Sequence, residues 1–360
     1  TADYQKGRTI LTAYVSVYDS LLFELEPLRQ EQKRGKASIG SVRIFPAERK
    51  KRLPEPEKIV LEEENCCLLD MAEYAFDDGE WQEEEELLKI DNRFRQKLNY
   101  PMRMEALAQP WATKGKEDRE HLLKLRFEIC TKKSIFRTFL AVEHPEEMKV
   151  ELNGCAVETD DAGWYVDRSI RKICLGSLKK GKNVLELQIP FGEKTNVEWA
   201  YLLGEFGVEI RGKKAVLTDY PARIYYGDYT AQGLPFYAGN LIYETNLCTG
   251  EGDLWLEIPG YRGALLQVEL DGKIKKNLIY APYRLNFEKV SAGEHKVCIK
   301  VYGNRANAFG AVHHTDHTET WYGPNLWRTE GAKWAYEYQL TPMGVLTTPL
   351  YWQTEREKNE

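Results

Sequence analysis

The stretch VELNG at residues 150–154 decides the fold, because it returns as VELDG at residues 268–272. In both places a strand of alternating residues runs into an Asn-Gly or Asp-Gly pair, which tolerates the positive φ of a tight hairpin turn. The match continues downstream, where LKKGKNVLELQI at 178–189 corresponds to VSAGEHKVCIKV at 290–301. Two matched hairpins in the same order predict an internal repeat of one β unit.

Strand and turn signals fill most of the rest of the chain. Short runs of Val, Ile, Leu, Tyr and Phe alternate with Gly, Asn, Asp and Pro, a pattern typical of β-sandwiches. The repeat predicts a mainly β protein with two tandem sandwiches, at residues 59–215 and 216–352. Residues 1–58 are expected to hold strands and a charged linker that continue from a missing upstream domain, and residues 353–360 a charged tail.

One segment breaks the β pattern. Apolar residues recur there at the three-to-four residue spacing of a single helical face, at Leu87, Ile90, Phe94 and Leu98. Pro101 follows, and a proline shortly after such a pattern favours a helix end. We therefore expect one peripheral helix outside the sandwiches.

The composition is that of a globular protein, with 42% hydrophobic and 29% charged residues in a chain of 360. No segment offers the roughly 20 apolar residues that span a bilayer. The formal net charge of -6 is mild, and the basic stretch at residues 49–52 is countered by the acidic run at 83–86. Neither a membrane nor nucleic acid is expected as a partner.

The cysteines predict the redox compartment. Their number is odd, seven, and there is no paired CxxC spacing among Cys66, Cys67, Cys130, Cys155, Cys174 and Cys298, which lie in apolar runs. This favours reduced, buried thiols and a cytoplasmic chain. The N-terminus shows no signal-peptide pattern and starts at Thr1 without methionine, so we expect a piece of a longer protein.

The first hairpin and its continuation, GWYVDRSIRKICLGSLKKGKNVLELQI at 163–189, resemble the sugar-binding jelly-roll domain of family 2 glycoside hydrolases and related galactose-binding-like modules. QGLPFYAGNLIY at 232–243 and GNRANAFGAVHH at 303–314 resemble segments in C-terminal β-modules of large bacterial proteins related to α-L-rhamnosidases. The resemblance covers roughly residues 59–350. It implies two tandem galactose-binding-like jelly rolls that belong to a larger glycosidase-like protein, with carbohydrate and an upstream catalytic domain as partners.

Catalysis within this chain is not expected. Glycoside hydrolysis needs two carboxylates held about 5 to 9.5 Å apart across the bond. Asp77-Asp78, Asp160-Asp161 and residues 83–86 are neighbours in sequence, which turn formation and solubility explain. The eight alternating helices of a (β/α)8 barrel are also missing. A non-catalytic accessory role is the leading hypothesis; a structural brace and a glycosidase with its own carboxylate pair are the alternatives.

The stretch FGAVHHTDHTETWYGPNLW at 309–327 is the main candidate site. A sugar offers C–H groups to an aromatic face and hydroxyls around its rim, so a binder needs aromatic rings beside hydrogen-bonding groups. We expect carbohydrate contacts from Trp164 of the first module and, in this stretch, from His313, His314, His317, Trp321, Tyr322, Asn325 and Trp327.

Two other interpretations of this stretch stay open. His313, His314 and His317 are a candidate zinc set, but the HExxH signature is absent and the Gly, Thr and Pro neighbours favour a loop. Alternatively, a long loop of this kind is packed by its own side chains onto a sandwich or a further domain. No cofactor is expected; a structural calcium, which leaves almost no sequence signature, stays open. Trp111 is expected to anchor an interface.

Overall fold

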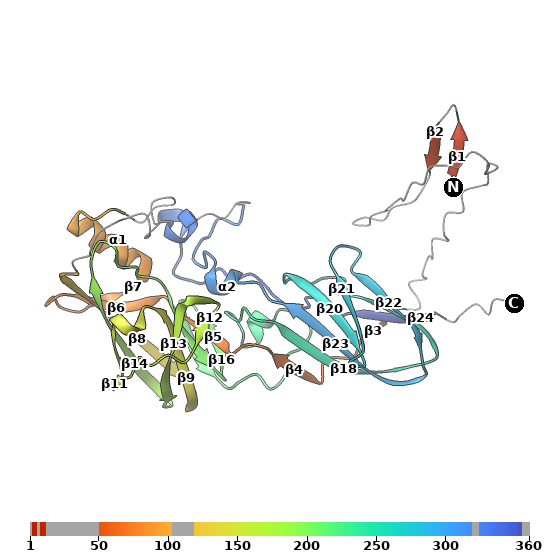
Figure 1. Ribbon diagram of the computed structural model, residues 1–360, viewed down its shortest axis with the longest axis horizontal. Coiled ribbons are helices and arrows are strands. Elements are labelled where there is room, and N and C mark those ends of the chain that lie inside the picture. The colour runs from red at the N-terminus through yellow and green to blue at the C-terminus, as the bar shows by residue number, and fades with distance from the viewer. Residues whose placement is uncertain (1, 6–7, 12–49, 103–118, 319–323, 355–360) are drawn as a thin grey trace.

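The computed structural model describes residues 2–5, 8–11, 50–102, 119–318 and 324–354, and it is mainly β (Figure 1). Two pairs of sheets, antiparallel except for the parallel pairing of residues 216–217 with 130–131, each enclose an apolar core. A separate hairpin is formed by β1 (Ala2–Gln5) and β2 (Arg8–Leu11). No described helix is long and apolar enough to cross a membrane.

The first sandwich consists of an eight-stranded and a five-stranded sheet. The larger sheet holds β6 (Met71–Phe76), β7 (Gln82–Glu86), β8 (His121–Thr131), β10 (Lys149–Leu152), β11 (Cys155–Val157), β14 (Gly181–Phe191), β16 (Gly207–Arg211) and β17 (Lys214–Thr218). The smaller sheet holds β5 (Asn65–Leu69), β9 (Ile135–Glu143), β12 (Trp164–Tyr165), β13 (Asp167–Leu178) and β15 (Ala200–Gly204). Alternate residues point inward, as the burial of Leu123, Leu125 and Phe127 along β8 shows.

The second sandwich is smaller, with a five-stranded and a four-stranded sheet. The first of these holds β4 (Lys58–Leu61), β18 (Leu241–Thr249), β20 (Leu265–Leu270), β21 (Ile274–Leu278) and β23 (Gly293–Tyr302). The other holds β3 (Lys51–Arg52), β19 (Gly252–Glu257), β22 (Arg284–Val290) and β24 (Leu350–Thr354). Its core is a separate apolar cluster that includes Leu254, Val268 and Phe287.

Both sandwiches pair their strands in the same order. The path β11-β10-β14-β8-β6 in the first matches β21-β20-β23-β18-β4 in the second, and β13-β9-β15-β5 matches β22-β19-β24-β3. The two quoted hairpins are confirmed and occupy equivalent places, as β10–β11 and β20–β21. Their turn residues have the positive φ expected of this turn chemistry: 54° and 77° at Asn153 and Gly154, 52° and 69° at Asp271 and Gly272.

The strand pairing differs from the linear division that the sequence predicts. β3 and β4 pair with β24 and β18, so residues 51–61 belong to the second sandwich rather than to a linker and the start of the first. The chain therefore places two strands in the second sandwich, builds the first, and then returns to complete the second. Local pattern did not indicate this arrangement, because both strands are short, β3 is exposed and charged, and the partners of both strands lie far along the chain.

The peripheral helix α1 (Leu87–Leu98) is confirmed. The Glu86 side chain accepts hydrogen bonds from the backbone N–H groups of Leu88 and Lys89, and Asn99 ends the helix in the left-handed conformation. The ring of Phe94 stacks on Phe76 at 4.0 Å, which packs the helix on the first sandwich. The other described helices are the single-turn α2 (Ala306–Phe309) and the 3₁₀ turns Pro145–Glu147, Tyr229–Gln232, Pro324–Arg328 and Gly331–Lys333.

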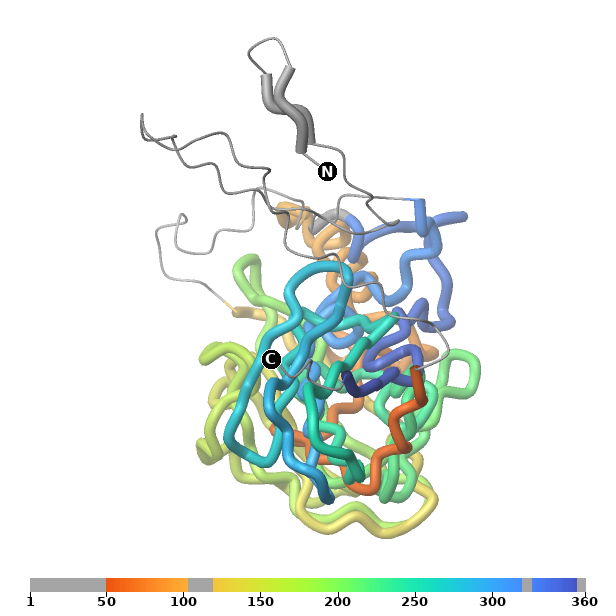
Figure 2. Tube along the Cα trace, turned by 90° about the vertical axis from the view of Figure 1, so that its right-hand side faces the viewer, coloured from red at the N-terminus to blue at the C-terminus, as the bar shows by residue number. Residues whose placement is uncertain are grey.

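A return segment, defined as residues 303–318 and 324–340, leaves β23 of the second sandwich and packs on the first. Ala308 and Val312 are buried in the core of the first sandwich, and Trp327, Tyr338 and Leu340 pack against it. In both views the blue return segment lies beside the orange helix α1 (Figures 1 and 2). The two sandwiches are thus joined by the strand crossing and by this segment.

Candidate functional site

His313 of the return segment is buried and contacts two acceptors. Its Nδ1 lies 2.8 Å from the carbonyl oxygen of Ala335, and its Nε2 lies 2.7 Å from Oδ2 of Asp70. A carbonyl and a carboxylate oxygen can only accept here, so the ring satisfies both when each nitrogen carries a proton. Burial lowers the pKa of His313, but the hydrogen bond and charge of Asp70 outweigh it and leave the pKa raised. His313 therefore joins the return segment to the first sandwich through these two contacts.

The carboxylate of Asp70 is the centre of a buried polar cluster. Its Oδ1 accepts a hydrogen bond of 2.7 Å from the hydroxyl of Tyr338. Burial raises the pKa of nearby Glu86 to about 7, against hydrogen bonds that Trp199 and the Leu88 backbone donate to it. The cluster is closed to solvent, because Asp70, Glu86 and His313 are all at most 3% exposed. It holds two elements together, and Asp70 and Tyr338 also line a cavity of about 110 Å³.

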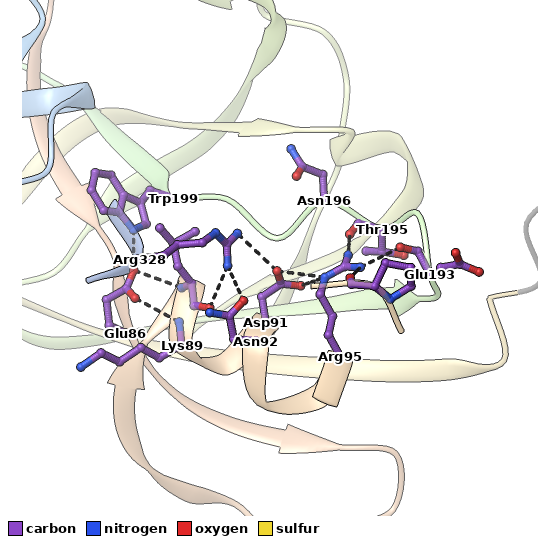
Figure 3. A network of polar contacts seen from close by, with 12 residues as sticks. Glu86, Lys89, Asp91, Asn92, Arg95, Glu193, Thr195, Asn196, Trp199 and Arg328 are labelled. Atoms are coloured by element: carbon purple, nitrogen blue, oxygen red, sulfur yellow. Dashed lines mark hydrogen bonds and ion pairs between the residues drawn. The ribbon is translucent and has the colours of Figure 1, made fainter. Parts of the chain in front are cut away.

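A second polar cluster fastens the return segment to α1 (Figure 3). The guanidinium of Arg328 donates to the Leu88 carbonyl at 3.2 Å and to Asn92 Oδ1 at 2.7 Å. Asp91 pairs with Arg328 and, at 2.9 Å, with Arg95, and both Asp91 and Arg95 are fully buried. Buried charges need this degree of pairing, since an unpaired one costs several kcal/mol.

The remaining candidate residues of the 309–327 stretch differ in their exposure and contacts. His314 is 4% exposed, with no partner for either ring nitrogen among the described residues, and His317 is exposed. Trp327 is half-buried and donates from Nε1 to the Phe309 carbonyl at 3.0 Å. Trp321 and Tyr322 lie outside the described residues, as does the side chain of Asn325, and so does Trp111. For His313, a sugar contact would require the loss of one of its two fastening interactions.

The zinc alternative does not match the geometry of His313, His314 and His317. Within the described parts of the chain, no group of three His, Cys, Asp or Glu side chains is arranged to hold a metal ion. His313 is engaged on both nitrogens, which removes it as a ligand in this arrangement. A structural calcium stays a prediction.

Trp164, the candidate from the first module, lies at a cleft where the two sandwiches meet. Its side chain is 54% exposed on β12. The cleft has a volume of about 650 Å³. Its walls come from the first sandwich through Trp164, Lys172 and Tyr220, and from the second sandwich and return segment through Leu61 and Arg305. Its other lining residues are Glu62, Glu63, Glu64, Asn65, Tyr165, Val166, Gly204 and Glu205.

Charged side chains that line this cleft form ion pairs with one another. Arg305 donates to both carboxylate oxygens of Glu63, at 2.8 and 2.9 Å, which is the bidentate geometry that suits guanidinium. Lys172 pairs with Glu64, and its ammonium also lies 4.4 Å from the Phe139 ring centroid. These pairs link residues about a hundred or more positions apart, so the cleft is assembled only in the folded chain.

The backbone beside Trp164 is strained. Val166 has a φ of 62°, in the left-handed region that a β-branched residue rarely adopts. The pairing of β12 with β13 shifts register between Trp164 and Tyr165. Tyr165 is buried, with its ring 5.3 Å from that of Tyr201, while Trp164 faces solvent. The local distortion thus separates an anchored tyrosine from an exposed tryptophan.

Sequence reasoning missed most of the cleft. The residues Glu63, Lys172, Tyr220 and Arg305 come from four separate segments. Lys172 lies within residues 163–189 and Arg305 within 303–314, but nothing in either stretch marks these two residues as part of a site. Only the exposed Trp164 carried a signal, as an aromatic residue between the Asn-Gly hairpin and the next strand. The other residues are brought together by the crossing of the chain between sandwiches, which no local pattern indicates.

The acidic pairs have structural roles in the described chain. Asp77 Oδ1 accepts from the Leu122 backbone N–H at 2.8 Å, and Asp161 Oδ1 accepts from Gly163 at 2.9 Å. Glu86, at the end of the acidic run, is the helix cap already described. These contacts agree with turn and cap formation as the reason for the pairs.

All seven cysteines are free, but the prediction that they are buried holds only in part. Cys66 and Cys67 are buried, and burial raises the pKa of the Cys66 thiol to about 12. The prediction is wrong for Cys155 and Cys174, which are exposed because they lie on the solvent-facing side of β11 and β13. A cytoplasmic location stays a prediction.

No protein-family model matches this chain, and no curated protein matches it. Solved structures offer distant likenesses. A rhamnosidase from Novosphingobium sp. PP1Y is 18% identical over 66% of this chain and 23% of its own, with a TM-score of 0.25. A β-D-mannosidase from Dictyoglomus thermophilum is 11% identical over 67% and 31%, with a TM-score of 0.26. A family 2 β-galacturonidase from Eisenbergiella tayi is 10% identical over 67% and 37%, with a TM-score of 0.22. The chain spans well under half the length of these three enzymes, and no family is assigned to it.

Proposed function

We propose that this chain is a non-catalytic carbohydrate-binding region of a larger glycoside hydrolase-like protein, and that its ligand binds in the cleft beside Trp164. The observation that carries the proposal is a tryptophan ring, 54% exposed, at a cleft of about 650 Å³ lined by polar side chains. We further propose that both sandwiches are galactose-binding-like jelly rolls, a view supported by their common strand order and by the hairpin motifs.

The chemistry of the cleft suits a sugar. The exposed indole offers an aromatic face to the C–H groups of a pyranose ring, and Tyr220, 37% exposed, offers a second ring with a hydroxyl. Carboxylates and the Tyr220 hydroxyl can exchange hydrogen bonds with sugar hydroxyls. At the base of the cleft, Asn65 donates to the Phe206 carbonyl at 2.7 Å, while its buried Oδ1 has no partner among the described residues.

The strained backbone supports a functional role for this place. Holding Val166 at a φ of 62° costs of order 1–3 kcal/mol, and such residues cluster at binding and catalytic sites. The strained Val166 directly follows the buried Tyr165 and lies two positions from the exposed Trp164. A tryptophan with only a packing role would gain stability by turning inward.

Calorimetric titration with a panel of oligosaccharides tests the proposal, using Trp164→Ala as the variant. We expect binding of a glycan by the native chain, at least a tenfold weaker affinity in the variant, and an unchanged melting temperature, because Trp164 is exposed. Phe136→Ala is the matched control, since Phe136 is 77% exposed and does not line the cleft. Absence of any heat signal at millimolar glycan, or equal binding by the Trp164 variant, would sink the proposal.

A second candidate function is a structural brace on an upstream catalytic domain. It is favoured by Ile279 and Tyr280, which are 68% and 71% exposed on the β21–β22 connection. Two neighbouring exposed apolar side chains suit a protein contact. Replacing both by serine should weaken co-purification with the catalytic domain and leave glycan binding unchanged. Unchanged co-purification together with weaker glycan binding would exclude the role as a structural brace.

A further inference from the structure

The charges that line the cleft determine which sugars it accepts, an inference that rests on the proposed function. Among the described lining residues there are four carboxylates, at Glu62, Glu63, Glu64 and Glu205, and two cations, at Lys172 and Arg305. We propose that the cleft binds amino sugars and neutral sugars and rejects uronic acids. The ligand class is thus defined by charge, beyond the general ability to bind carbohydrate.

The two cations of the cleft are not available to an acidic ligand. Both guanidinium contacts of Arg305 with Glu63 are occupied, and the hydrogen bond and charge of Glu63 raise the pKa of Arg305. Lys172 is only 16% exposed and is paired with Glu64. A uronate could recruit either cation only by displacing a carboxylate that is already in place, which would leave that carboxylate unpaired beside the incoming one.

Glu62 is ionised but, like Glu63 and Glu64, it is paired with a cation. The Lys300 ammonium contacts both of its carboxylate oxygens at 2.7 Å, and Asn240 donates to Oε2 at 2.8 Å. These contacts lower the pKa of Glu62, so it stays ionised at neutral pH. Lys300 itself does not line the cleft.

Glu205 is the carboxylate best placed to meet a ligand. It is exposed and has no ion pair among the residues that the structure describes. Its charge also reaches Tyr220, where burial and Glu205 together raise the pKa of the phenol. An ammonium group on a sugar ring near Trp164 and Tyr220 would therefore find an unneutralised acceptor, whereas a uronate would face a like charge.

Sugars that differ only in charge separate the effect of ligand charge on affinity from the effect of ligand shape. Galactose, galactosamine and galacturonate oligomers form one set, and glucose, glucosamine and glucuronate oligomers form another, each titrated by calorimetry at low and high salt. In whichever set binds, we expect the uronate to bind at least about tenfold more weakly than the neutral sugar, and the amino sugar a few-fold more tightly. High salt should narrow both differences, because exposed charges are screened.

Two variants test the role of Glu205. Glu205→Lys should raise uronate affinity and lower amino-sugar affinity, while Glu294→Gln, at an exposed acid of the second sandwich, should change neither. Uronate binding equal to or tighter than neutral binding in the native chain would overturn this inference and leave the proposed function standing, provided that the binding is lost in Trp164→Ala. A failure of every sugar to bind would instead remove the proposed function, and this inference with it.

Discussion

The two sandwiches have the same strand order but place their charges differently. The first, together with α1 and the return segment, buries Asp70, Glu86, Asp91, Arg95 and His313. Among the described residues of the second, the only buried side chain of this titratable kind is His295, which pairs at 2.7 Å with Asp271 of the β20–β21 turn. One fold thus carries either a nearly apolar core or a core fastened by paired charges, and the difference follows from what packs onto it.

The equivalent connections differ as well. Between β11 and β13 the first sandwich carries Trp164, which faces a cleft, whereas the connection between β21 and β22 carries Ile279 and Tyr280, which face solvent. The cleft exists only on the first because the crossing chain and Arg305 of the return segment supply its other wall. Strand order alone therefore does not determine a binding site; the neighbouring segments do.

Removing Arg95 should produce the largest loss of stability. Its guanidinium contacts both oxygens of Asp91 and the carbonyls of Pro101, Glu193 and Thr195. Arg95→Met should lower the free energy of unfolding by about 3–5 kcal/mol, because buried Asp91 loses its ion pair with Arg95. Urea unfolding measures this. Lys275→Met, at an exposed ion pair of the second sandwich, should cost under about 1 kcal/mol, and equal losses would contradict the comparison.

Stability should fall as pH rises through neutrality. Folding raises the pKa of Glu86 to about 7, so between about pH 4.5 and 7 the folded state keeps a proton that the unfolded state has lost. The raised pKa of His313 acts in the same direction, since its stabilisation is complete below about pH 6.5 and is lost as pH rises through the folded pKa. Glu86→Gln should remove about 2–3 kcal/mol of this fall, seen in urea unfolding between pH 5 and 8. If the free energy of unfolding fell equally with pH in the native chain and in Glu86→Gln, this prediction would be wrong.

Replacing His313 by glutamine should lower the free energy of unfolding by about 2 kcal/mol. His313→Gln loses the charge-assisted contact with Asp70 and leaves a buried carboxylate with Tyr338 as its described partner. Hydrogen exchange should speed up at residues 306–312 and 335–340 more than in the second sandwich. His317→Gln, an exposed neighbour, is the control and should leave exchange unchanged. If hydrogen exchange instead became faster to the same extent in both sandwiches, the return segment would not be a locally stabilised unit.

The smallest expected effect tests whether the hairpins are equivalent. Gly154 and Gly272 have φ values of 77° and 69°, and an added Cβ would meet no atom within 3.4 Å at either. Gly154→Ala and Gly272→Ala should therefore each cost about 1 kcal/mol through backbone strain alone. Thermal unfolding can compare the two. Costs that differ by more than about 1 kcal/mol would mean that the two turns are not equivalent.

Local patterns predicted the helix and both hairpins, because their information lies within a few residues. The four apolar positions from Leu87 to Leu98 and the Asn-Gly and Asp-Gly turns needed no distant partner. The role of β3 and β4 was not predictable in this way, since their partners are β24 and β18. The histidine stretch was ambiguous for the same reason: the acceptor that explains His313 is Asp70, far away in the sequence. Trp164 was found, but its cleft is a property of the assembled chain.

The pairing of β3 with β24 has a mechanical consequence. Lys51 pairs with Tyr351 and Arg52 with Leu350, so residues 50 and 354 lie at the same end of an antiparallel pair. A pulling force applied at residues 50 and 354 would load β3 and β24 in the unzipping geometry, so that their hydrogen bonds break one after another. In the shear geometry all of these bonds would be loaded together. Extension would peel the second sandwich first. The first sandwich, with its cleft-forming strands and buried charges, lies off the direct load path until β4 has been pulled from β18.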